Sequence, residues 1–184
     1  MKKTLLSAVM IASFGIAALA SQAARAVDGT ITFTGKVVAN TCQFSVNNGP
    51  ASNTVVLPVV FTSSLTAAGN VAGTTPFTIS ATKCDTNLTS VQAYFTSTAN
   101  IDGTTGNLKN TGGTAGNVQV QLLNGTTNVP MPLNAASATA QNSPVGSVSS
   151  GGTVTMSYKA QYYATGTATP GPVSTSVDYT INYL

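Results

Sequence analysis

Apolar and polar residues alternate with a period of two along most of the chain after residue 26. Short β-branched or apolar runs are separated by clusters of Gly, Pro and Asn, which is typical of short strands joined by turns. Strands are expected within residues 27–46, 54–60, 77–84, 91–98, 117–123, 154–163 and 175–183. No window has the apolar spacing of an amphipathic helix. The pattern predicts an all-β chain, and the number of segments favours a sandwich.

Both ends of this region carry a clear strand pattern. The alternating set at the C-terminal end is Thr175, Val177, Tyr179, Ile181 and Tyr183, and the sequence stops one residue later. The corresponding set after residue 26 is Val27, Gly29, Ile31, Phe33 and Gly35. The pattern alone fits ordinary strands that pair within one molecule.

The first 26 residues have the features of a secretory signal peptide. Two lysines precede an apolar run over residues 5–20, and Ala24-Arg25-Ala26 has the small-x-small pattern of a cleavage site. The run is at or below the roughly 17–25 residues that span a bilayer, which favours a cleaved leader over a membrane anchor. We expect cleavage after Ala26, with cleavage after Ala23 as the alternative, and export of the remaining chain.

Charge and composition exclude several functional classes. The chain has 7 Lys and Arg against 4 Asp and no His. Three of the basic residues lie in the predicted leader, so the rest is neutral and contains no Arg, and we expect no binding of nucleic acid. With no His or Glu and no clustered Asp, the sequence predicts neither an enzyme nor a metal site, and no cofactor or small-molecule substrate.

The two cysteines, Cys42 and Cys84, both follow the predicted leader. An even number of cysteines in an exported chain predicts one disulfide. A closed loop of about 43 residues contributes about 4 kcal/mol of stability in the chain-entropy model.

Several short motifs occur in a specific order. They are Thr-Gly-Lys-Val-Val-x-x-x-Cys at 34–42, Lys-Cys-Asp-Thr-Asn at 83–87, Gln-Tyr-Tyr-Ala-Thr-Gly at 161–166 and Ala-Thr-Pro-Gly at 168–171. The chain also has a penultimate tyrosine, Tyr183, and Gly171 is the fourteenth residue from its end. In this order and spacing the chain resembles the chaperone–usher pilin family, and most closely the type 1 fimbrial major subunits.

The resemblance implies an incomplete immunoglobulin-like sandwich that lacks its last strand and is completed by donor-strand exchange. It implies that the cysteines join the first two strands, and it divides the chain into a signal peptide (1–26), a donor extension (27–35) and a pilin domain (36–184). The implied donor positions are Val27, Gly29, Ile31, Phe33 and Gly35. The implied acceptor edge, which also binds the chaperone, comprises Gly171, Thr175, Val177, Tyr179, Ile181 and Tyr183.

The resemblance also implies partners and a location. The partners are neighbouring pilin subunits in a homopolymer, a periplasmic chaperone and an outer-membrane usher, and the destination is a fimbria reached through the periplasm. The expected function is that of a structural fimbrial subunit that supports bacterial adhesion. The alternatives are a minor adaptor or tip pilin and a self-contained secreted β-sandwich that acts as a binding module.

Overall fold

The structure is a computed structural model that describes residues 31–35, 37, 42–97 and 99–184. The chain divides into two units, residues 1–36 and 37–184. In the first unit, residues 31–35 form no strand, and Ile31 and Phe33 are 80% and 89% exposed. The predicted signal peptide and the donor positions Val27 and Gly29 lie outside the described residues.

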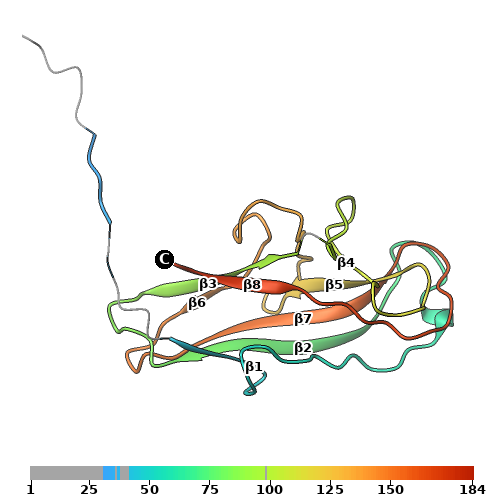
Figure 1. Cartoon of the computed structure of the whole chain (residues 1–184), viewed down its shortest axis with the longest axis horizontal. Coiled ribbons are helices and arrows are strands. Elements are labelled where there is room, and N and C mark those ends of the chain that lie inside the picture. The colour runs from blue at the N-terminus through green and yellow to red at the C-terminus, as the bar shows by residue number, and fades with distance from the viewer. Residues whose placement is uncertain (1–30, 36, 38–41, 98) are drawn as a thin grey trace, which may run out of the picture. The chain divides into compact units, whose positions relative to one another are not determined.

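The second unit, here called the body, consists of two antiparallel sheets (Figure 1). The order is β1-β2-β7-β5-β4 in one sheet and β6-β3-β8 in the other. The strands are β1 (Gln43–Val46), β2 (Val71–Thr82), β3 (Ser90–Thr96), β4 (Leu108–Lys109), β5 (Val118–Asn124), β6 (Val145–Ser147), β7 (Val154–Ala164) and β8 (Asp178–Tyr183). One 3-10 turn, η1 (Thr62–Ser64), is the only helical element in the described residues. The all-β prediction is confirmed.

No helix in the described part of the chain has the length and hydropathy to cross a membrane.

The long strands β2 and β7 form because their apolar residues recur at every second position. In register, Phe77 lies opposite Tyr158 and Ile79 lies opposite Met156, and all four side chains are buried. The residues between them on β7 are exposed Thr and Ser. Over these stretches of β2 and β7 a period of two therefore places one face of the strands against the core and turns the other toward solvent, whereas all seven residues of β5 are buried.

Aromatic rings connect the two sheets through the core. Phe77 of β2 stacks on Tyr158 of β7 at 5.2 Å between ring centroids, and Phe95 of β3 meets Tyr158 edge-on at 5.3 Å. The Tyr158 hydroxyl lies 3.3 Å from the Ser143 hydroxyl, and burial raises the pKa of Tyr158 to about 12. This contact between the sheets holds them face to face along the middle of the body.

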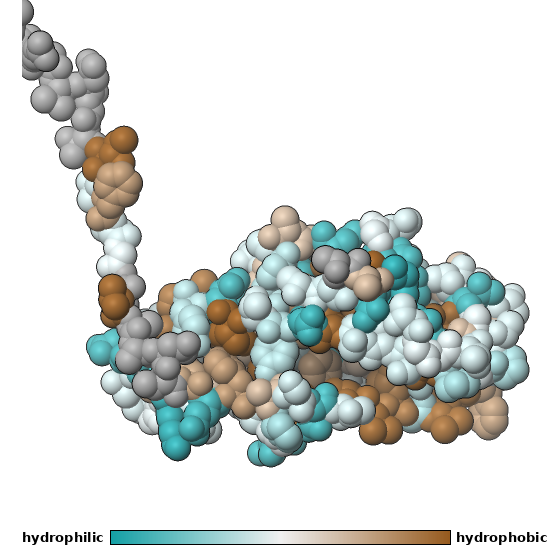
Figure 2. Space-filling model, in the orientation of Figure 1, coloured by the Kyte–Doolittle hydropathy of each residue, from teal (hydrophilic) through white to brown (hydrophobic). Residues whose placement is uncertain are grey.

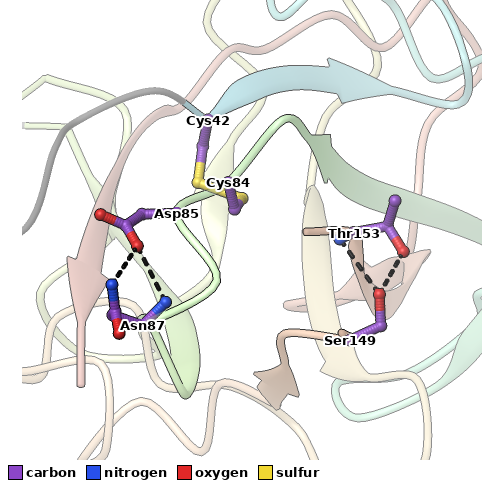
Figure 3. Close-up of a disulfide and its surroundings, with 6 residues drawn as sticks. All are labelled: Cys42, Cys84, Asp85, Asn87, Ser149 and Thr153. Atoms are coloured by element: carbon purple, nitrogen blue, oxygen red, sulfur yellow. Dashed lines mark hydrogen bonds between the residues drawn. A yellow bond between two sulfur atoms is a disulfide. The ribbon is translucent and has the colours of Figure 1, made fainter. Parts of the chain in front are cut away.

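The expected disulfide is present and ties the first two strands together (Figure 3). Cys42 lies directly before β1, and Cys84 follows the end of β2, so the bond closes one end of this strand pair. The Cys84 N–H donates to the Gly152 carbonyl at 3.0 Å. Gly152 has a φ of +68°, and a Cβ there would lie 2.5 Å from the Cys84 oxygen, so this position requires glycine.

The predicted strand at 54–60 is wrong, although its alternation is real. Val55 and Leu57 are half-buried while Val56 is 79% exposed, yet the segment belongs to no sheet. Pro58 lacks a main-chain donor, and the described residues provide no neighbouring strand beside it. A strand pattern without a partner strand produces an extended segment and no hydrogen-bonded ladder.

The ends of the chain also differ from the predictions. The first assigned strand, β1, covers only the last four residues of the 27–46 pattern, and β8 begins at Asp178 instead of residue 175. The short strands β4 and β6 were not predicted, because two or three residues are too few to show a period. The remaining predicted strands correspond to β2, β3, β5 and β7.

Candidate functional site

An open groove with a volume of about 1110 Å³ runs along the body. One wall is the C-terminal segment that ends in β8, and the other is the extended segment 51–57. The floor consists of core side chains from both sheets, namely Phe77, Ile79, Phe95, Leu108, Val120, Leu122 and Ala160. Figure 2 shows hydrophobic surface, in brown, along the lower half of the body in this view. The groove thus exposes part of the hydrophobic core.

The groove exists because β8 is an edge strand. It pairs with β3, from Val91 opposite Tyr183 to Thr96 opposite Asp178, and it is the last strand of its sheet. The Leu184 N–H donates to the Ser90 carbonyl of β3. Because main-chain groups alternate in direction along a strand, the N–H and C=O groups of the even-numbered residues of β8 point toward β3, and those of the odd-numbered residues point toward the open edge. The odd-numbered residues therefore present both their side chains and their main-chain groups to the groove.

The wall continues over residues 173–177, which precede β8. Hydrogen bonds to side chains and loops hold this segment where no neighbouring strand pairs with it. Gly112 N–H donates to the Ser174 carbonyl at 2.9 Å, and the Asn100 side-chain amide donates to the Ser176 carbonyl at 2.8 Å. The Ser174 N–H in turn donates to the Asn110 side-chain oxygen at 2.8 Å. These bonds keep residues 173–177 extended, with odd-numbered side chains half-buried and even-numbered ones exposed.

The structure brings together most of the residues expected at the acceptor edge. The groove-lining members are Thr175, Val177, Tyr179, Ile181 and Tyr183. Gly171 lies elsewhere, in a smaller pocket of about 450 Å³. Its φ is +154°, and a Cβ would lie 2.6 Å from the Ala115 nitrogen. Gly171 therefore allows a close main-chain approach in the turn that leads into the wall.

One hydrogen bond links the two walls across the groove. The Tyr179 hydroxyl donates to the Ala51 carbonyl at 2.9 Å, and the Tyr179 ring lies 6.4 Å from the Phe95 ring on the floor. Burial raises the pKa of Tyr179 above its ordinary value of 10.0. The Tyr179 side chain thus connects the two walls of the groove.

The chemistry of the groove suits an extended apolar peptide. Of the described residues that line it, Asp178 carries the one full charge. No group of three or more His, Cys, Asp or Glu side chains able to hold a metal ion occurs in the described part of the chain. An apolar groove beside an open strand edge is a surface that can bind a further β-strand.

The predicted donor positions are described in part. Ile31 and Phe33 are exposed, and a Cβ built on Gly35 would meet nothing within 4 Å. Sequence reasoning missed the second wall: Val55 and Leu57 line the groove, and the only signal was the β-branched run that contains Pro58.

This sandwich, open along one edge, is the incomplete immunoglobulin-like fold of a pilin subunit. A solved relative in fold is the P pilus rod subunit PapA, with a TM-score of 0.50 and 18% identity over 84% of this chain and 100% of that one. The family described as type-1 fimbrial protein, A, matches residues 57–184.

Curated relatives agree over nearly the whole length. The F17 fimbrial protein of Escherichia coli is 47% identical over 91% of this chain and 94% of its own length. The major fimbrial subunit SMF-1 of Stenotrophomonas maltophilia strain K279a is 45% identical over 90% and 98%. The type-1 fimbrial protein, A chain, of Escherichia coli K12 is 32% identical over 100% of both chains. The chain belongs to the type-1 fimbrial protein A family and is a structural subunit of a surface fimbria.

Proposed function

We propose that this fimbrial subunit polymerises by donor-strand exchange, in which residues 27–35 of one copy fill the groove of the next. The observation that carries the proposal is the groove itself, whose floor is the core of the sandwich and whose wall is an open strand edge. Strand addition to a sheet edge is an established mode of recognition, and pilins are a known example of it.

The donor and the acceptor edge match in length and period. Residues 27–35 and residues 175–183 each span nine positions, and each has five that face the same way. A nine-residue strand extends about 30 Å at about 3.4 Å per residue. The inserted strand could therefore cover the edge from end to end.

The exposed apolar side chains of the donor supply a driving force. Ile31 and Phe33 are 80% and 89% exposed, so nearly all of their surface is available for burial in a partner. Burial is worth about 1.5–3 kcal/mol for each side chain, before the cost of ordering the strand. Main-chain hydrogen bonds to the open edge of β8 add to this along the strand.

Head-to-tail growth requires the donor to lie antiparallel to β8. The start of β1 and the carboxyl end of β8 lie at one end of the body, and η1 lies at the other (Figure 1). Only six residues, 36–41, separate the proposed donor from Cys42, which lies directly before β1 of its own body. An antiparallel donor leaves the groove at the η1 end of the acceptor, while β1 of the acceptor, which follows that subunit's own extension in sequence, begins at the opposite end. This arrangement repeats without closing and generates a filament.

A subunit with an empty groove needs protection before assembly. An open strand edge beside exposed core side chains promotes aggregation. We propose that a periplasmic chaperone occupies the groove after export and signal-peptide removal, and that an outer-membrane usher assembles the subunits into a fimbrial shaft that supports adhesion. The role is structural, with no catalytic step.

The proposal can be tested on the mature chain by deleting residues 27–33. The deletion should abolish fibres, seen by electron microscopy, while the body still forms a complex with its chaperone. A second variant exchanges Thr32 and Phe33. The exchange keeps the composition but turns the phenylalanine ring to the other face of the strand, so this variant should also assemble poorly. Fibres from the deleted protein would refute the donor assignment. Gold-labelled antibody should mark the whole shaft for a shaft subunit, and only isolated points for a minor adaptor.

A further inference from the structure

The disulfide connects the start of β1 to the start of β3 and leaves out the chain between them. Cys42 lies directly before β1, and Cys84 lies between β2 and β3. The bond therefore closes a loop that contains β1, the second wall of the groove at residues 51–57, and β2. Beyond Cys84 only residues 85–89 lead to β3. The covalent route from Cys42 to β3 is thus much shorter through the two sulfur atoms than along the main chain.

The connection from Cys84 to β3 is held by several hydrogen bonds (Figure 3). The Cys84 N–H donates to the Gly152 carbonyl at 3.0 Å, and the Asn87 N–H donates to the Asp85 carboxylate at 2.8 Å. The Leu88 N–H donates to the Asp85 carbonyl at 3.0 Å, and the Leu88 side chain is buried. A force applied at Cys84 therefore reaches β3 with little rearrangement of this connection.

β1 and the second wall, by contrast, are held to the body as one unit. β1 is an edge strand that pairs only with β2 over its four residues. The turn after it bonds back to Val46, because the Gly49 N–H and the Asn53 side-chain amide both donate to the Val46 carbonyl at 2.9 Å. Residues 51–57 continue from this turn and belong to no sheet. Detachment of β1 would therefore pull the second wall out of the groove.

In a filament assembled as proposed above, each subunit carries load at two places. Its own donor pulls at Cys42 through residues 36–41, and the donor of a neighbouring copy pulls on the groove beside β8. The start of β3 pairs with the carboxyl end of β8, at the end of the body opposite η1, and the neighbouring donor leaves at the η1 end. The two forces therefore load β3 and β8 in opposite directions along their ladder. Since ladder hydrogen bonds lie perpendicular to the strands, they resist such a load together.

We propose that the Cys42–Cys84 disulfide is a tension bypass, which passes load from Cys42 to the β3–β8 ladder and keeps β1 and the second wall unloaded. The inference deepens the proposed function and rests on it. Without the bond, load at Cys42 acts first on β1, and loss of β1 opens the groove that holds the neighbouring donor. This role differs from the entropic contribution of the disulfide to stability, which is present without any load.

The test stretches polymers of the mature chain at constant load and follows their lifetime, before and after the assembled polymers are reduced. Ser45→Gly weakens β1 at a position that does not line the groove, and Thr155→Gly is the matched control on β7, outside the closed loop. Ser45→Gly should leave the lifetime of the disulfide-bonded polymers unchanged and shorten that of the reduced polymers roughly 2- to 5-fold, as expected for a glycine in a strand. Thr155→Gly should have the same effect in both redox states.

Two further measurements separate the path of the load from stability. In denaturant without load, Ser45→Gly should destabilise bonded and reduced polymers alike. Under load, reduced polymers should lengthen before they separate, because residues 43–57 detach and extend to about 50 Å at about 3.3–3.6 Å per residue. Bonded polymers should show no such step. A chain with both Cys42→Ser and Cys84→Ser should behave as the reduced polymers do, and it provides the same comparison without reductant.

Equal shortening of the lifetime by Ser45→Gly in both redox states would overturn the tension bypass while leaving donor-strand exchange intact. The same conclusion would follow if reduced polymers separated without first lengthening. Fibres from a chain that lacks residues 27–33 would instead refute the proposed function.

Discussion

Replacing Phe33 with Ala should weaken the assembly of subunits without affecting the folding of each subunit. The Phe33 side chain is 89% exposed in its own subunit, so its removal should change the stability of that subunit by less than about 0.5 kcal/mol. In the groove of a second copy the same side chain would be buried, and transfer of a phenylalanine is worth about 1.5–3 kcal/mol. Because the groove is open, water can refill the vacated space, and we add no cavity cost. The substitution should weaken each interface roughly 10- to 100-fold.

The assay follows polymers of mature wild-type and Phe33→Ala chains through increasing guanidinium, with size-exclusion chromatography to count released subunits. Thr32→Ala is the matched control, because its side chain faces away from the groove in the proposed strand. We expect the Phe33→Ala polymers to dissociate at lower denaturant, while the chaperone-bound subunits unfold alike. Phe33→Ala polymers as durable as wild type, or an equal loss from Thr32→Ala, would show that the alternating face does not drive assembly.

Three further predictions concern the body. Tyr179→Phe removes the hydrogen bond to Ala51 across the groove, so a donor peptide should bind faster and the empty subunit should lose about 0.5–1.5 kcal/mol of stability. Stopped-flow binding measures the first effect and denaturant unfolding the second. Slower binding of the peptide would show that this hydrogen bond does not oppose entry of the strand. Reducing the Cys42–Cys84 bond, 42 residues apart in sequence, should cost about 4 kcal/mol in denaturant unfolding, and a Cys42→Ser chain should no longer respond to reductant. The main-chain N–H groups of Thr105 and Thr104 lower the pKa of Asp102, so its contribution to stability is present above its ordinary pKa of 3.8 and is lost as the pH falls through the lower folded value. Asp102→Ala should therefore lower the melting temperature at neutral pH and should converge with wild type in strong acid; a constant difference at all pH values would contradict this cause.

The strands that could be predicted are those whose burial is decided locally. In β7 an alternation such as Val154, Met156 and Tyr158 against exposed Thr and Ser determines the buried face wherever the strand is placed. The alternation of the C-terminal segment likewise indicated a strand, and its odd-numbered residues line the groove; that they form an edge was implied only by the family resemblance. In the proposed donor segment the described residues 31–35 are all exposed, so the alternation of Ile31 and Phe33 has no buried face within its own subunit.

The groove itself depends on which segments become neighbours, and a pattern of residues cannot specify that. Residues 54–60 have the composition of a strand but form none, because a ladder needs a partner strand alongside. Only folding shows that residue 51 meets Tyr179, or that Thr175 is buried without a hydrogen-bond partner in the described residues. Periodicity is a local property and determines which face of a strand is buried, whereas the open edge of β8 is produced by its pairing with β3, between residues 82 to 92 positions apart.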